Sequence, residues 1–213
     1  MRKSQPLNPG GTIADSETLS ELLVILSRCF EQPDASFVEA VNNGEFAEAL
    51  TQRTAQLDID VPPASPIEDL QTARAGYRRT FEAYDGPYAP PVESVYKEWH
   101  DGQHRELLSG PPAVAMQRTL TEAGIDVPDR YPPDHIVVLL EFVSMLLTAD
   151  DLEAVRSFWE THLDWIPAFQ ERVEQTSDDP FYRWATTVLS RTVAAVEEEL
   201  AKQTPEHNSS MIE

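Results

Sequence analysis

Apolar side chains recur at intervals of three and four residues through most of this 213-residue chain. That spacing places them on one face of an α-helix, whereas a half-buried β-strand would alternate apolar and polar residues. The first periodic segment covers residues 15–30, where Asp15 or Ser16 can cap the helix. No segment alternates in the manner of a strand and no internal repeat is visible, so the sequence predicts an all-α protein, a helical bundle of one domain.

Proline and glycine divide the rest of the chain into further segments of helical spacing. Gly44 is expected to separate two of them, and Pro167 is expected to bend or divide another. Asp179 and Pro180 stand in the order of a helix cap followed by the first helical residue. The further predicted helices lie within residues 34–41, 44–57, 67–84, 111–125, 133–147, 150–175 and 179–200.

The two ends of the chain differ from its middle. Residues 1–14 and 204–213 are mostly polar and show no sustained apolar period, so they are predicted to be disordered tails. Residues 15–203 are predicted to form the single domain, because a chain that is 41% hydrophobic can build a core without disulfides or metal. Within that domain, about residues 85–110 form a link rich in Pro and Tyr between two helical groups, and links of this length are often functional.

The charge balance is strongly acidic, with 37 Asp and Glu against 16 Lys and Arg and a formal net charge of -21. This balance disfavours nucleic acid as a partner, because affinity for a polyphosphate comes mainly from Lys and Arg. Lysine occurs only at Lys3, Lys97 and Lys202. We interpret this acidic, lysine-poor composition as that of a halophilic archaeal protein, for which net charge maintains solubility. An acidic surface that holds a basic partner is the alternative interpretation.

Cys29 is the single cysteine, so an intramolecular disulfide and a thiolate metal cluster are both excluded. No apolar segment follows Arg2 and Lys3, which argues against a signal peptide. The longest apolar run, about fifteen residues from Ile136, is too short to span a membrane and is interrupted by Glu141. The sequence therefore predicts a cytoplasmic protein without stable membrane insertion.

The segment PPDHIVVLLEFVSMLL places Asp134 and His135 directly before the most apolar run of the chain. A helix that starts near Pro133 would put Asp134 in its first turn, where a carboxylate is favoured by the exposed N–H groups. Asp134 and Glu141 would then share one narrow polar stripe on a helix that is otherwise apolar and therefore central. The spacing leaves two interpretations of the pair open, the cap of a core helix and a binding site.

His100 and His104 are four residues apart, a spacing that can ligate zinc on a helix. Gly102 between them weakens the helix, and no further pair of ligands stands out. Phosphate-binding glycine loops and a nucleophile elbow are absent from the sequence. We therefore predict no catalytic residues, no metal and no cofactor, and we keep as an alternative an all-α metal-dependent hydrolase that uses the two histidines with Asp134 and His135.

An ordered series of motifs from about Leu19 to Leu200 resembles the TorD/DmsD/NarJ family of redox-enzyme maturation chaperones. The series contains YRRTFEAY, a proline-rich link ending in PPVESVY, the helix end EAGI, and then PPDHIVVLLEFVSMLL. FWETHLDWIPAF and DPFYRWATTVLSRTV follow in the order of the family. The link is shorter here, and residues 137–140 lack a glutamate that some members carry. The ordered series is more specific than any one motif.

The resemblance implies an all-helical, non-enzymatic chaperone. Such a chaperone binds the twin-arginine signal peptide of the apo form of a molybdopterin oxidoreductase of the DMSO reductase superfamily. It holds that enzyme back from export until the cofactor is inserted. The resemblance thus favours the binding interpretation of Asp134 and His135, with which capping is compatible. The positions that match the family's signal-peptide-binding residues are Tyr77, Phe81, Tyr84, Ser94, Tyr96, Gly110, Asp134 and His135.

The chemistry of a twin-arginine peptide agrees with this expectation. Its cationic n-region and apolar h-region require a receptor with a carboxylate beside apolar side chains. Asp134, with Glu141 as a second carboxylate, is expected to face the arginines, and the aromatic residues of YRRTFEAY to receive the apolar part. The client remains open among DMSO, trimethylamine N-oxide and nitrate reductases, as does the choice between a monomer and a helix-exchanged homodimer. A helical adaptor without a role in export is the remaining alternative.

Overall fold

The computed structural model describes residues 15–82, 86–99, 102–105, 108–126 and 130–202. The predicted tails, residues 1–14 and 204–213, lie outside the described residues, as does part of the predicted link. Within the described ranges the chain forms nine α-helices and one 3-10 turn, so the prediction of an all-α fold is confirmed. No helix in these ranges is both long and apolar enough to span a membrane.

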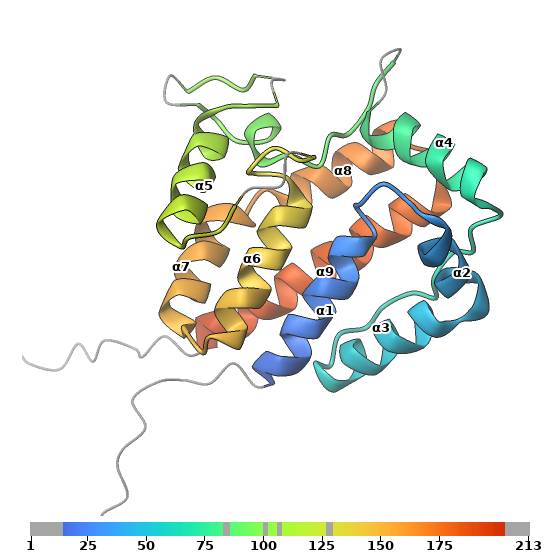
Figure 1. Ribbon diagram of the computed structural model, residues 1–213, viewed down its shortest axis with the longest axis horizontal. Helices are drawn as coiled ribbons and strands as arrows, with labels where there is room; N and C mark the ends of the chain where they lie inside the picture. Colours follow the sequence, from blue (N-terminus) through green and yellow to red (C-terminus); the bar gives the residue numbers. More distant parts are fainter. Residues whose placement is uncertain (1–14, 83–85, 100–101, 106–107, 127–129, 203–213) are drawn as a thin grey trace, which may run out of the picture.

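The helices follow one another with short connections, except at residues 57–69, 82–110 and 123–135, where longer segments join them (Figure 1). They are α1 (Ser16–Arg28), α2 (Ala35–Asn43), α3 (Glu45–Gln56), α4 (Leu70–Phe81), the 3-10 turn η1 (Glu93–Val95), α5 (Pro111–Glu122), α6 (Ile136–Thr148), α7 (Leu152–His162), α8 (Ile166–Thr176) and α9 (Pro180–Lys202).

Aspartate side chains fix where most of these helices begin. Asp15, Asp34, Asp69 and Asp151 each accept a hydrogen bond from the backbone N–H three residues later. Asp179 accepts from the N–H of Phe181 at 3.0 Å at the start of α9. These bonds satisfy donors that have no partner inside the helix. The predicted caps Asp15 and Asp179 are confirmed.

The two predicted helix breaks are also confirmed. Gly44 separates α2 from α3 with a φ of 90°, a left-handed conformation that glycine adopts without steric cost. Pro167 lies in the first turn of α8, where proline is tolerated, so the predicted segment 150–175 is divided into α7 and α8.

The start of α6 differs from the prediction. The helix begins at Ile136 with His135 as its N-cap, rather than near Pro133. The N–H of His135 donates to the carbonyl of Pro132 at 3.0 Å, so the chain turns before the helix starts. The first-turn position predicted for Asp134 is therefore wrong, since the residue precedes the helix. Its carboxylate accepts hydrogen bonds from Ser94, 40 residues away, instead of from the first turn of the helix.

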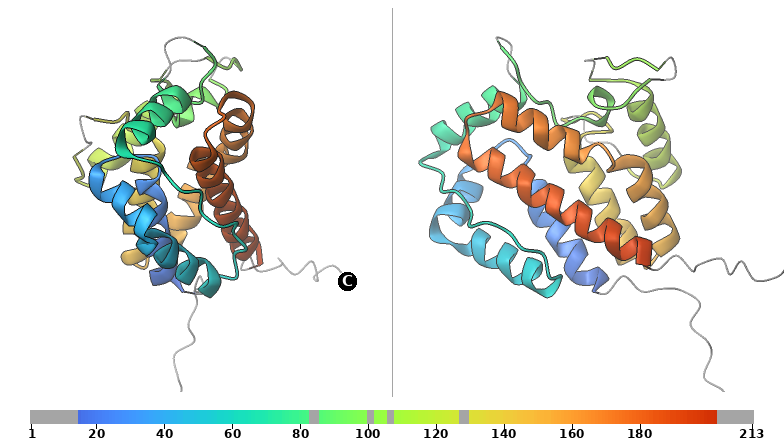
Figure 2. Two further views of the ribbon diagram at one scale, coloured as in Figure 1. Left: turned by 90° about the vertical axis from the view of Figure 1, so that its right-hand side faces the viewer. Right: turned by 180° about the vertical axis from the view of Figure 1, so that it is seen from behind.

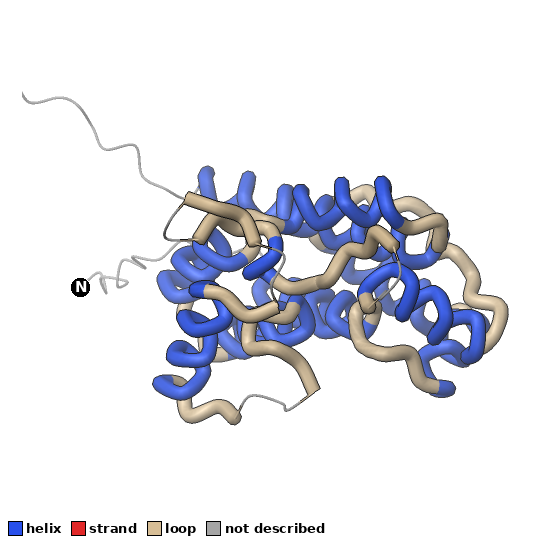
Figure 3. Tube along the Cα trace, turned by 90° about the horizontal axis from the view of Figure 1, so that it is seen from above, coloured by secondary structure: helices blue, strands red, loops and turns tan. Residues whose placement is uncertain are grey.

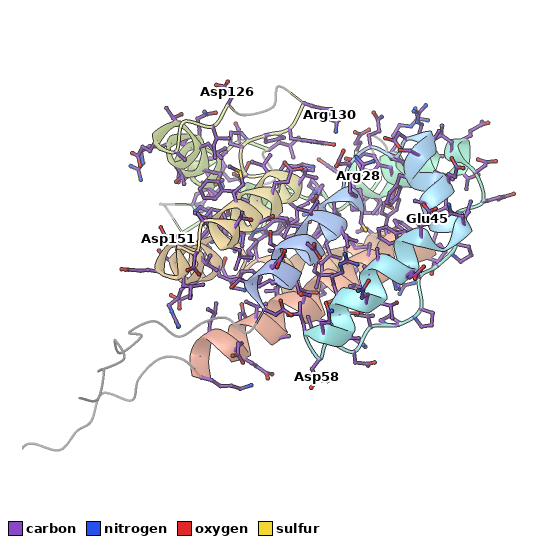
Figure 4. All side chains as sticks on the ribbon, turned by 60° about the horizontal axis from the view of Figure 1, so that its bottom comes forward. Arg28, Glu45, Asp58, Asp126, Arg130 and Asp151 are labelled. Carbon is purple, nitrogen blue, oxygen red and sulfur yellow. The ribbon has the colours of Figure 1, made fainter. Side chains whose placement is uncertain are left out.

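The central helix of the bundle is α6, as its apolar circumference predicts. Figure 1 shows α6 beside α1, and the view from behind in Figure 2 shows α9 crossing in front of both. Seen from above, several loops lie over the ends of the helices (Figure 3). Charged side chains project from the periphery, among them Arg28, Glu45, Asp58, Asp126, Arg130 and Asp151 (Figure 4). The buried residues of α6 are Ile136, Val137, Val138, Leu139, Leu140, Phe142, Val143, Ser144 and Leu147.

Candidate functional site

The candidate site lies where the loop before α6 meets the segment around η1. Val92 and His135 form an isolated antiparallel bridge. The N–H of Ile136 donates to the carbonyl of Pro91 at 2.9 Å, and the N–H of Glu93 donates to the carbonyl of Asp134 at 3.1 Å. These backbone bonds hold the two loops together although they are about 40 residues apart in the sequence, so each fixes the position of the other.

The carboxylate of Asp134 is fully buried at this junction. Its Oδ2 accepts hydrogen bonds from the N–H of Ser94 at 2.8 Å and from the Ser94 hydroxyl at 2.5 Å. Its Oδ1 has no hydrogen-bond partner among the described residues. Burial raises the pKa of Asp134, the bonds from Ser94 oppose that rise, and the nearby Glu93 adds to it. The site thus contains a buried acidic group with one oxygen still able to accept.

Ser94 connects this carboxylate to two further residues. Its Oγ accepts from the N–H of Gly110 at 3.0 Å, and its carbonyl accepts from the indole N–H of Trp99 at 3.2 Å. A Cβ on Gly110 would lie 2.6 Å from the nearest atom of the Trp99 ring, so only glycine fits unless the ring moves. We refer to Ser94, Trp99, Gly110 and Asp134 together as the clasp.

His135 is buried beside the clasp, and its side chain caps α6. Its Nδ1 accepts from the N–H of Val137 at 3.3 Å, and its ring stacks on Tyr131 with the ring centroids 4.2 Å apart. The guanidinium of Arg130 lies 4.8 Å from the centroid of the Tyr131 ring. Burial, with the Arg130 charge as a smaller contribution, lowers the pKa of His135 to about 3. His135 is therefore neutral at physiological pH, as an accepting Nδ1 requires.

A second buried network follows Glu93, the residue before Ser94. Glu93 is 1% exposed and accepts at Oε1 from Lys97 at 2.9 Å, while its Oε2 lies 2.9 Å from His162 Nδ1. Lys97 also pairs with Asp164 at 2.7 Å. Burial alone would lower the pKa of Lys97, but Asp164 and Glu93 together raise it. This network ties η1 to α7, and the sequence analysis did not predict it, because no spacing relates residues 69 positions apart.

Two of the predicted aromatic residues lie in the core instead of in the clasp. Tyr77 and Phe81 are each 3% exposed and pack edge-on with their ring centroids 5.2 Å apart. The Tyr77 hydroxyl donates to the carbonyl of Phe30 at 3.2 Å, and Phe81 packs on Tyr182 at 4.8 Å. Tyr84 lies outside the described residues. The rings that are described therefore present almost no surface to a ligand.

The other predicted site residues are distributed around the clasp and along α6. Ser94, Gly110, Asp134 and His135 come together, as described above. Tyr96 is half-buried and stacks on Trp165 with the ring centroids 5.1 Å apart. Glu141 is exposed on α6. The pKa of its carboxyl is raised by partial burial and by the nearby Glu31, an effect that Arg130 and Arg28 oppose without cancelling.

The metal-site alternative has no support in the described part of the chain. There, no group of three or more His, Cys, Asp or Glu residues is placed to hold a metal ion. The imidazole of His104 is largely exposed and lies 3.8 Å from Glu98, while His100 lies outside the described residues. Asp134 and His135 make the hydrogen bonds of the clasp and of the helix cap.

Comparison with known proteins identifies the family. The family described as nitrate reductase delta subunit matches residues 40–171, which include the whole clasp. The chain belongs to this family. The TorD/DmsD/NarJ resemblance found in the sequence is thereby confirmed.

Named relatives in this family agree with the assignment. The selenate reductase assembly chaperone protein of Thauera selenatis is 27% identical over 208 residues, covering 91% of this chain and 95% of the relative. The chaperone protein TorD of Vibrio cholerae is 31% identical over 127 residues, covering 51% of this chain and 55% of the relative. Both names are those of chaperones, in agreement with the predicted non-catalytic class.

The fold is shared with a protein of solved structure. That structure is a crystal structure from Archaeoglobus fulgidus, described as a candidate redox enzyme maturation protein. It superposes with a TM-score of 0.53 at 23% identity and covers 89% of this chain and 97% of that chain. The similarity extends over nearly the whole bundle, so the helical arrangement described above is that of a known fold.

Proposed function

We propose that this protein is a cytoplasmic maturation chaperone. It binds the twin-arginine signal peptide of a molybdopterin oxidoreductase of the DMSO reductase superfamily and holds the apo enzyme back from export until its cofactor is inserted. The observation that carries the proposal is the match to a named assembly chaperone over 91% of this chain. The clasp and its surroundings are the recognition site in this proposal.

The state of Asp134 supports an arginine as the recognised group. A guanidinium is planar, always charged, and donates paired hydrogen bonds to a carboxylate. The free Oδ1 of Asp134 is an acceptor, and a buried acceptor without a partner costs about 1–3 kcal/mol, which an incoming donor would recover. Because Asp134 is fully buried, an arginine can reach its carboxylate only after the residues that bury it have moved. Binding and opening of the clasp are therefore coupled.

The remaining residues take supporting roles in the proposal. Glu141, exposed on α6, is the second carboxylate available to the arginine pair. Tyr77 and Phe81 act from within the core, where they hold α4 against Phe30 and Tyr182. Tyr96 continues the segment that carries Ser94.

Calorimetric titration in molar KCl tests the proposal. The ligand is a synthetic twin-arginine signal peptide of a molybdopterin oxidoreductase, and a second peptide has both arginines replaced by lysine. We expect saturable binding to the wild type, and at least about tenfold weaker binding both for Asp134→Asn and for the lysine peptide, a loss of about 1.4 kcal/mol. Asparagine keeps the shape of the side chain, so the variant removes the charge with little change in packing.

Asp69→Asn is the matched control. Asp69 also precedes a helix, but its side chain caps α4, and asparagine caps a helix equally well. Binding should be unchanged in this variant. Circular dichroism gives the folded fraction of each protein, so that affinity is expressed per folded molecule. Equal affinity of the wild type for the arginine and lysine peptides would contradict the proposal.

A further inference from the structure

A shallow groove of about 280 Å³ opens between α5, α6 and α7. These three helices lie side by side in Figure 1, on the side of the molecule away from α2 and α3. The two phenylalanines of the groove are each 6% exposed, and the threonines and the serine that line it contribute hydroxyl groups. The groove is lined by Thr119, Phe142, Leu146, Ala154, Ser157, Phe158, Thr161 and His162.

The lining of this groove is uncharged, as is that of the larger groove beside residues 61–66 and Trp184. None of its lining residues is Asp, Glu, Lys or Arg, in a chain of which 25% is charged and the net charge is -21. An apolar floor with an uncharged polar rim favours an apolar, uncharged segment and disfavours a charged one. The groove is thus chemically suited to the h-region of a signal peptide and unsuited to its arginines.

The groove is also connected to the clasp. His162 lines the groove and lies 2.9 Å from the buried Glu93 through its Nδ1. Glu93 precedes Ser94, which holds Asp134. The larger groove beside the prolines at 62 and 63 and Trp184 lacks such a connection, because among the described residues no hydrogen bond joins its lining to Glu93 or to the clasp.

We infer that the groove between α5, α6 and α7 receives the apolar h-region of the signal peptide, while the clasp receives the arginines. The inference rests on the proposed function and names the surface for the second half of the peptide. An apolar helix would lay side chains spaced by three or four residues against the half-buried Leu146 and Ala154 of the groove. The groove replaces Tyr77 and Phe81 as the surface that contacts the apolar part of the peptide, because both of those rings are buried.

A pair of threonines provides the variants that test this inference. Thr161 lines the groove, and its hydroxyl donates to the carbonyl of Ser157 at 2.7 Å. Thr121 is not among the groove residues, is exposed on α5, and donates in the same manner to the carbonyl of Gln117 at 2.8 Å. Thr161→Trp fills the groove with an indole, and Thr121→Trp makes the same change outside it. Both side chains are exposed, so neither substitution disturbs the core.

Calorimetric titration with the twin-arginine peptide should give at least about tenfold weaker binding for Thr161→Trp and a change of less than about twofold for Thr121→Trp. A second peptide keeps the arginines but carries glutamines in place of the leucines of the h-region. It should bind the wild type and Thr161→Trp equally, because the blocked groove no longer matters. Urea denaturation of each variant establishes that the folded state is retained.

Two results would overturn the inference, and they have different consequences for the proposed function. If the wild type binds the peptide and Thr161→Trp binds it as tightly, the groove assignment is wrong while the proposed function stands. If the wild type shows no saturable binding, the proposed function fails and the groove assignment fails with it.

Discussion

Asp134 and His135 are neighbours in the sequence, but their side chains meet different surroundings. The carboxylate of Asp134 accepts from Ser94, whereas the imidazole of His135 caps its own helix and stacks on Tyr131. The sequence singled out the pair and predicted capping, but assigned the cap to the wrong residue. Nothing local to residue 134 reveals a hydroxyl donor 40 positions earlier, and that donor decides the orientation of the carboxylate.

The depressed pKa of His135 predicts a specific pH dependence of stability. The folded-state pKa is about 3, whereas the unfolded value is about 6.5. As the pH falls below about 6.5, the unfolded chain takes up a proton that the folded chain does not, so the free energy of unfolding decreases. Between pH 7 and pH 5 this residue alone accounts for a loss of about 2 kcal/mol.

Urea denaturation of the wild type and His135→Asn at pH 7 and pH 5 measures this contribution. Asparagine can supply the cap through its amide oxygen but does not titrate. The variant is expected to be less stable at pH 7, because it loses the stacking on Tyr131. The difference in the free energy of unfolding between wild type and variant should shift in favour of the variant by about 2 kcal/mol at pH 5. A difference in stability that is the same at both pH values would show that folding does not lower the pKa of His135.

At the scale of helices, the apolar period predicted the elements well, because their caps and breaks are local. Asp15, Gly44, Pro167 and Asp179 act within a few residues of their own position, which a sequence makes visible. The apolar period does not predict how closely one helix approaches another. That approach depends on single small residues whose significance appears only in three dimensions.

Gly76 is such a residue, and its replacement tests the contact of α4 with α9. Alanine in a helix interior is favoured over glycine by about 1 kcal/mol. At Gly76, however, a Cβ would collide with Oδ2 of Asp179, the cap of α9. We expect the collision to outweigh the helical preference, so that Gly76→Ala lowers the free energy of unfolding by about 1–3 kcal/mol, as overpacking does. Chemical denaturation gives the value.

The control removes the obstacle instead of the glycine. In the background Asp179→Ala, which itself costs about 1 kcal/mol as a lost cap, Gly76→Ala should become neutral or slightly stabilising. The double-mutant cycle isolates the coupling between the two positions. Equal effects of Gly76→Ala in both backgrounds would indicate that α4 and α9 do not approach as described.

At the scale of the whole molecule, the excess of 21 negative charges acts on stability through repulsion. The Debye length falls from about 10 Å at 0.1 M salt to about 3 Å at 1 M, so salt screens this repulsion. Exposed ion pairs are screened as well, but each contributes only about 0–1 kcal/mol. The melting temperature is therefore expected to rise from 0.1 M to 2 M KCl, by about 2–4 °C for each kcal/mol of relieved repulsion.

Scanning calorimetry at the two salt concentrations makes the measurement. Sucrose at matched osmolality is the control, since it favours compact states by exclusion but does not screen charge. A melting temperature that does not change, or that falls with salt, would contradict the role of net repulsion.

The groove between α5, α6 and α7 belongs to this scale too, and no sequence pattern predicted it. Phe142 and Phe158 follow the apolar period of their own helices, and that period alone indicates a place in the core. The neighbouring positions on the rim become a shared surface only through the packing of three helices from different parts of the chain. Sequence reasoning could find the carboxylate of the site but not the surface beside it.

The tight contact of Gly110 with the Trp99 ring has a consequence for the history of the family. The space at this point is fixed, so a larger side chain at one position requires a smaller one at the other. The two sites should therefore have changed in concert, with glycine retained wherever the indole is kept and lost only where the aromatic ring has already been replaced. Correlated substitutions of this kind across many relatives would show that the contact between positions 99 and 110 is kept in the family.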